Sequence, residues 1–66
     1  MGNATMNIAQ RILSSSFDRD QAFKTAVNET SLVEIEEDFL SDEKVFIFND
    51  KSRLVFIGSH HFEARP

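Results

Sequence analysis

The sequence predicts an α+β domain, in which two short N-terminal helices pack on one face of a three- to four-stranded antiparallel meander. Two observations lead to this prediction. The first half of the chain carries apolar residues at helical spacing behind capping residues. The second half holds two apolar runs of strand length, 45–48 and 54–57, which flank the polar stretch 49–52. With 66 residues the chain is expected to form a single small domain, 1–66.

The first helix is expected over residues 5–15. Four apolar residues in this range follow the spacing of one helical face: Ile8, Ala9, Ile12 and Leu13. Asn3 or Thr5 is the expected N-cap, because a side-chain oxygen at that position accepts a hydrogen bond from a free amide of the first turn. The serines at 14–16 compete for backbone hydrogen bonds and should end the helix.

The second helix is expected to start at Asp18, which can cap the amide of Gln21 while the Gln21 side chain reaches back in a capping box. Phe17 precedes the cap, where it can pack onto Ala22 as a hydrophobic staple. The apolar residues that follow, Phe23 among them, share one face of the helix.

This helix cannot continue beyond Thr30. At about 100° per residue, the apolar side chains from Leu32 onward fall on the side opposite the buried face, so we expect a break within 28–31. Val33 and Ile35 alternate with glutamates, which predicts a half-buried strand over 32–36. A short helix over 35–40 is the alternative.

The two apolar runs predict a β-hairpin with Asp50 and Lys51 at its tip. In that register Phe48 faces Arg53 and Phe46 faces Val55. One sheet face then carries Val45, Ile47, Leu54 and Phe56, and the other carries Phe46, Phe48, Val55 and Ile57. Asp-Lys is not a preferred two-residue turn, so a four-residue loop with the same register fits equally well. Gly58 allows a bend before a short final strand over 60–64.

Strands without polar alternation are typical of sheets that are covered on both faces. Two helices cover one face, and exposing the other would forgo roughly 1.5–3 kcal/mol per large apolar side chain. Summed over the apolar side chains of that face, the lost free energy rivals the total stability of a small domain, about 5 kcal/mol at the low end. We therefore expect the second face to bind a protein partner or a second copy of the chain: Phe46, Phe48, Val55 and Ile57. Helices that wrap round one end of the sheet are the alternative.

The charge is distributed unevenly. The net charge is −4, and residues 29–43 hold seven acidic residues and no lysine or arginine. Such a field attracts basic surfaces and repels phosphate. We expect six of these acids to steer a basic partner surface: Glu34, Glu36, Glu37, Asp38, Asp42 and Glu43. A solvated acidic face without a partner is the simpler interpretation.

Composition narrows the class of protein. The chain has no cysteine, which favours a reducing compartment, and no apolar segment approaches the roughly 18 residues of a membrane span. We therefore expect a cytoplasmic protein with no membrane contact. All seven aromatic residues are phenylalanine, which we expect mainly in the core.

No catalytic, cofactor or metal motif is present, and no small-molecule substrate is evident. His60 and His61 are adjacent, so in a strand they point to opposite faces and cannot readily share one metal ion. The acidic segment lacks the glycine of a calcium loop. Nucleic acid is not an expected partner, because the second helix is nearly neutral and stacking tyrosines and tryptophans are absent.

The function predicted from the sequence is a non-enzymatic protein-interaction module of the small acidic inhibitor or adaptor type. One alternative is a nucleic-acid-associated regulator that uses the second helix and the hairpin tip, with Lys24, Lys51 and Arg53 as the contacts. Another is an accessory subunit of a larger complex.

Overall fold

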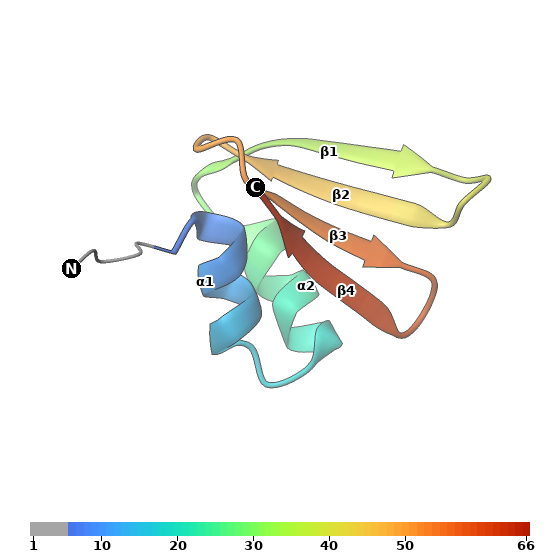
Figure 1. Ribbon diagram of the computed structural model, residues 1–66, viewed down its shortest axis with the longest axis horizontal. Coiled ribbons are helices and arrows are strands. Elements are labelled where there is room, and N and C mark those ends of the chain that lie inside the picture. The colour runs from blue at the N-terminus through green and yellow to red at the C-terminus, as the bar shows by residue number, and fades with distance from the viewer. Residues whose placement is uncertain (1–5) are drawn as a thin grey trace.

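The structure is a computed structural model that describes residues 6–66. Two helices are followed by four strands: α1 (Ile8–Ser15), α2 (Arg19–Asn28), β1 (Leu32–Asp38), β2 (Glu43–Phe48), β3 (Arg53–Ile57) and β4 (His61–Arg65). The strands form one antiparallel sheet in the order β1-β2-β3-β4, as Figure 1 shows. The prediction of an α+β fold with an antiparallel meander is confirmed, including the fourth strand.

Helix α1 begins later than expected. Its N-cap is Asn7, whose side chain accepts a hydrogen bond from the amide of Gln10, and the Gln10 side chain accepts one from the amide of Asn7 in return. The expected caps, Asn3 and Thr5, both lie outside the described residues. Asn7 completes a reciprocal capping box that neither of those positions can form with Gln10, because the box needs a spacing of three residues.

The loop between β2 and β3 satisfies the remaining amides at the start of α1. Asp50 Oδ2 accepts a hydrogen bond from the amide of Ile8 at 2.9 Å, and Ser52 Oγ accepts one from the amide of Ala9 at 3.1 Å. The Ser52 hydroxyl in turn donates to Asp50 Oδ1. Since the first amides of a helix have no partner within the helix, this loop caps α1 and also joins it to the sheet.

Helix α2 begins as predicted, with Asp18 Oδ1 accepting a hydrogen bond from the amide of Gln21 at 2.9 Å. The Gln21 side chain accepts from the amide of Phe17 instead of that of Asp18. The predicted staple is wrong, because Phe17 is 91% exposed and does not cover Ala22.

Strand β1 confirms the predicted strand and extends it to Asp38, so the alternative helix over 35–40 is wrong. Leu32 pairs with Phe48 and Glu34 pairs with Ile47, which leaves Val33 as the extra residue of a β-bulge. Val33 and Ile35 were expected on the buried side, but both are exposed. Both lie on an edge strand, which has a neighbouring strand on one side alone.

The β2–β3 hairpin has a different register from the predicted one. Phe46 pairs with Leu54 and Ile47 with Arg53. The amide of Phe48 donates to the carbonyl of Ser52, and the amide of Lys51 donates to the carbonyl of Phe48, which closes a three-residue loop over 49–51. Lys51 has a φ of 74°, the left-handed conformation that such a loop requires at its third residue. This one-residue shift moves β3 side chains to the opposite face relative to β2.

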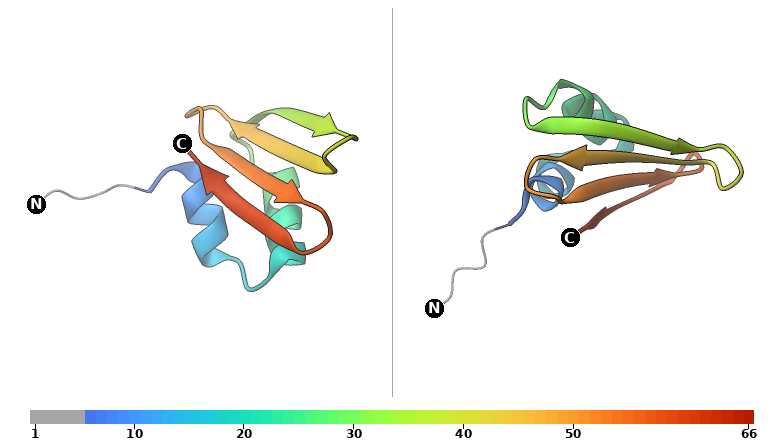
Figure 2. Two further views of the ribbon diagram at one scale, coloured as in Figure 1. Left: turned by 45° about the vertical axis from the view of Figure 1, so that its right-hand side comes forward. Right: turned by 90° about the horizontal axis from the view of Figure 1, so that it is seen from above.

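The core lies between the helices and the face of the sheet that β2 and β3 turn toward them. Its buried residues are Ala9, Ile12, Ala22, Ala26, Phe46, Phe48, Leu54 and Phe56. The rings of Phe23, Phe46 and Phe56 meet edge to face, with centroids 5.3–5.5 Å apart. Figure 2 shows both helices on the same side of the sheet.

The cap on α1 should make stability depend on pH. Substituting Asp50→Ala is expected to lower the free energy of unfolding by about 1 kcal/mol at neutral pH, as for other lost N-terminal caps. The hydroxyl of Ser52, followed by the amides of Ile8 and Ser52, lowers the pKa of Asp50 in the folded protein. The ionised Asp50 carboxylate therefore contributes its full stabilisation above the pKa of an unfolded aspartate, about 4. This stabilisation is lost as pH falls through the lower pKa of Asp50 in the folded protein.

Urea unfolding followed by far-ultraviolet circular dichroism measures this effect at about pH 7 and about pH 2. The difference between the wild type and Asp50→Ala should shrink in acid. Glu36→Gln, which removes an exposed carboxylate, serves as the control and should change stability little at either pH. A difference that does not change with pH would show that the Asp50 carboxylate does not stabilise α1.

The left-handed conformation of Lys51 in the three-residue loop predicts how a glycine at this position changes stability. Lys51→Gly should raise the free energy of unfolding by roughly 0.5–1 kcal/mol, because glycine adopts a positive φ without the clash of a Cβ atom. Asn49→Gly is the matched control in the same loop and should give no such gain. If Lys51→Gly destabilises the protein in urea unfolding, the loop conformation and the register derived from it are both wrong.

Candidate protein-interaction surface

The β1–β2 hairpin projects beyond the helices and beyond the turn between β3 and β4, as Figure 1 shows. Residues 34–43, which lead into the turn of this hairpin and out of it, are called the acidic arm below. The acidic arm consists of the second part of β1, a four-residue connection over 39–42, and the first residue of β2. Alternating residues of β1 point to opposite faces of the sheet, so the arm presents side chains on both.

All six acidic site residues predicted from the sequence lie on the acidic arm: Glu34, Glu36, Glu37, Asp38, Asp42 and Glu43. The seventh acid of the segment, Glu29, is the C-cap of α2, and its side chain is largely buried beside Arg11 at 3.4 Å. The arm itself contains no lysine or arginine. Lys44, which follows directly, lies 3.6 Å from Glu37.

The strand register places acidic groups on both faces of the arm. Glu36 pairs with Val45, and Asp38 pairs with Glu43, all on the face away from the helices. Glu37 pairs with Lys44 on the face toward the helices. The Asp38–Glu43 pair sets two carboxylates opposite each other, an arrangement that weakens a sheet. The arm thus has more negative charge than its folding would favour.

The tip of the arm is held in a defined turn. Asp38 Oδ1 accepts hydrogen bonds from the amides of Leu40 at 3.0 Å and Ser41 at 3.4 Å. A hydrogen bond from the Ser41 side chain, followed by these two amides, lowers the pKa of Asp38. Asp42 has a φ of 54°, and its carbonyl accepts a 2.9 Å hydrogen bond from the amide of Gly58 in the β3–β4 turn.

Phe39 and Leu40 stand at this tip with their side chains in solvent. Phe39 is 87% exposed and Leu40 is 101% exposed. The expectation that Phe39 belongs to the core is wrong, because the turn carries it away from the helices. Sequence reasoning missed this apolar pair as a candidate site. The signal that could have found it is the position of two large apolar residues between Asp38 and the Ser-Asp pair at 41–42, where a connecting turn is expected.

The predicted apolar face does not exist as a surface. Phe46 and Phe48 point toward the helices and are buried, whereas Val55 and Ile57 lie on the opposite face. The one-residue register shift separates the two pairs. Phe46 and Phe48 are therefore part of the core and not available to a partner in the folded protein.

The sheet face away from the helices carries Val45, Ile47, Val55 and Ile57. No helix of the described chain lies over it (Figure 2), yet Val55 is 0% exposed and the other three are partly buried. Glu63, which pairs with Val55, accepts hydrogen bonds from His61 at 2.9 Å and from Arg65. These two bonds, first that from His61, lower the pKa of Glu63. Long charged side chains therefore stand on the same face as the apolar row, and the methylene groups of such side chains can cover apolar surface.

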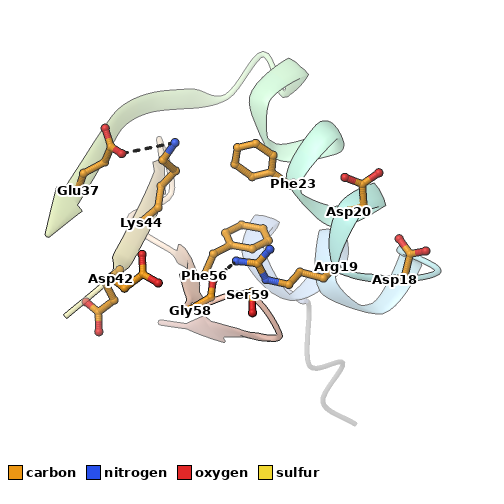
Figure 3. A pocket seen from close by; sticks show the side chains of 11 residues that line it. Asp18, Arg19, Asp20, Phe23, Glu37, Asp42, Lys44, Phe56, Gly58 and Ser59 are labelled. Atoms are coloured by element: carbon orange, nitrogen blue, oxygen red, sulfur yellow. Dashed lines mark hydrogen bonds and ion pairs between the residues drawn. The ribbon is translucent and has the colours of Figure 1, made fainter. Parts of the chain in front are cut away.

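A cavity of about 530 Å³ lies between α2 and the acidic arm, as Figure 3 shows. Arg19 donates a 2.7 Å hydrogen bond to the carbonyl of Gly58, and its guanidinium carbon is 5.2 Å from the centre of the Phe56 ring. Lys44 lies 5.2 Å from the centre of the Phe23 ring. Both cations and both ring faces are therefore engaged within the protein. The lining contains no histidine or cysteine.

The cations of the nucleic-acid alternative are mostly engaged as well. Lys24 lies 3.3 Å from Asp20, and Arg53 donates to the carbonyl of Pro66 at 3.3 Å. Lys51 is exposed on the β2–β3 loop. These residues lie on separate elements and do not form one basic patch.

Two further features bear on the class of protein. Among residues 6–66, no group of three or more His, Asp or Glu side chains is placed to hold a metal ion. Neither α1 nor α2 is long and apolar enough to cross a membrane. No protein-family model matches the chain, and no curated protein or solved structure is significantly similar to it.

Proposed function

We propose that this protein is a non-enzymatic interaction module of the small acidic inhibitor or adaptor type, which presents its acidic arm to a basic surface of another protein. The observation that carries the proposal is the exposure of Phe39 and Leu40 at the tip of the arm. Burying a large apolar side chain is worth roughly 1.5–3 kcal/mol, and the fold leaves that free energy unused at both positions. Apolar side chains of this kind, enclosed in a partner's pocket, are common binding anchors.

Charge defines the kind of partner. The arm carries six carboxylates, and Lys44, which pairs with Glu37 near the tip, engages one of them. Approach of a basic surface is accelerated by such a field, and approach of an acidic one is slowed. Two copies of the arm repel each other, so a second copy of this chain is a poor partner for this surface. The expected complex forms faster at low salt, because exposed charges are screened over about 10 Å at 0.1 M.

The arm is also free to serve binding because the core does not depend on it. The buried cluster draws its residues from the helices, from the last part of β2 and from β3. The Asp38 side chain holds the tip in one turn through two backbone amides. A tip that is already ordered loses less conformational entropy when it enters a partner site.

Selection from a library of random peptides displayed on phage tests the proposal. Immobilised wild-type protein should enrich sequences that combine lysine or arginine with large apolar residues. The double variant Phe39→Ser, Leu40→Ser should bind the enriched peptides about tenfold more weakly or worse, since a lost anchor costs at least about 1.4 kcal/mol. Its free energy of unfolding should stay close to that of the wild type, because both side chains are exposed.

The matched control is Phe17→Ser, which removes an equally exposed phenylalanine outside the arm and should leave binding unchanged. Replacing Glu34, Glu36 and Glu43 by glutamine should weaken binding and flatten its salt dependence. Enriched peptides without basic residues, or equal binding by the tip variant, would contradict the proposal.

A further inference from the structure

We infer that the free edge of β1 accepts an extended basic strand from the partner, which adds a fifth strand to the sheet. The inference rests on the proposed function and names the way in which the acidic arm holds its partner. In the proposed function Phe39 and Leu40 at the tip of the arm are the apolar anchors. The edge of β1 would add backbone hydrogen bonds to the same partner.

The free edge is the first observation. In the order β1-β2-β3-β4, strand β1 pairs with β2 on one side, and no strand of the described chain lies on its other side. Residues 33–38 are all exposed. Figure 1 shows β1 along the outer margin of the sheet. An exposed edge of this kind presents unpaired amides and carbonyls, and extended peptides bind to such edges by strand addition.

The side chains along the edge are the second observation. Ile35 pairs with Phe46 on the face toward the helices, yet it is 45% exposed. Helix α2 contacts β1, and its Val27 is 47% exposed. An added strand with apolar side chains on this face would extend the core past Ile35. Ile35 and Val27, which the four-stranded sheet leaves half exposed, would then be buried.

The opposite face of β1 sets the charge of the added strand. Glu34, Glu36 and Asp38 lie there at every second position. Side chains of an added strand stand directly beside those of β1, and opposite charges at such positions stabilise the pair. A strand that alternates lysine or arginine with apolar residues therefore matches both faces of β1 at once.

The other edge of the sheet does not offer this pattern. Strand β4 contacts α1, and its charged residues already form ion pairs among themselves. Pro66 follows directly and has no amide to donate. A second copy of the chain is also excluded from the β1 edge, because two β1 strands side by side would set glutamates against glutamates. The charge that prevents self-pairing selects a basic strand.

A synthetic peptide tests the inference. The probe is a capped peptide of about nine residues that alternates lysine and valine, close to the length of a natural strand. It is titrated into the isotope-labelled protein and followed by amide shifts and amide hydrogen exchange. Shifts should concentrate on 33–38, and alternate amides of β1 should gain protection, because only those that point outward form new hydrogen bonds.

The matched control peptide carries N-methyl groups on alternate backbone nitrogens and keeps every charge. It should bind at least about tenfold more weakly, since it cannot donate to the edge. The variant Glu34→Lys, Glu36→Lys should lose the lysine–valine peptide and gain binding to a glutamate–valine peptide.

Equal binding by the methylated peptide would overturn strand addition while recognition of basic partners through the arm stands. Amide shifts confined to Phe39 and Leu40 would likewise overturn strand addition and leave recognition through the arm in place. If neither peptide binds and the displayed library also yields no basic sequences, both the inference and the proposed function fail.

Discussion

The structure depends on one contact, between the β2–β3 loop and the start of α1. Asp50 and Ser52 accept hydrogen bonds from the amides of Ile8 and Ala9, which lie more than forty residues earlier in the chain. Ser52 is buried, and its hydroxyl both accepts from Ala9 and donates to Asp50. The same loop sets the register of the hairpin through Lys51. A single short loop thus decides which strand residues face the helices and attaches α1 to them.

This arrangement separates the part of the protein that folds from the part that is proposed to bind. The loop places Phe46, Phe48 and Phe56 beneath the helices, where all three are buried. The tip of the acidic arm lies at the opposite end of β2, and the arm contributes no residue to the buried cluster. Charge repulsion within the arm therefore costs little of the stability provided by the core. A surface that folding does not require can carry side chains that suit a partner.

The sheet face without helices shows why two apolar runs in the sequence do not produce an exposed apolar binding surface. An apolar residue on a sheet face without a helix above it is not necessarily exposed to water. Val55 is fully buried on that face, with Glu63 across from it and Ile57 two residues along its own strand. In a twisted sheet, long side chains on neighbouring strands lie across shorter ones, and their methylene groups cover apolar surface while their charges reach water.

The sequence by itself determined the features that depend on neighbouring residues. The cap of α2 at Asp18, the strand character of β1 to β4 and the gathering of six acids in one segment all follow from local chemistry and spacing. Tertiary structure alone decided the hairpin register, the exposure of Phe39 and the burial of Val55. The physical reason is that strand pairing has a period of two, so one left-handed residue in a loop exchanges the faces. Burial then depends on how far the helices extend along one face of the sheet and on which side chains of neighbouring strands lie over the other, and a pattern of apolar residues specifies neither.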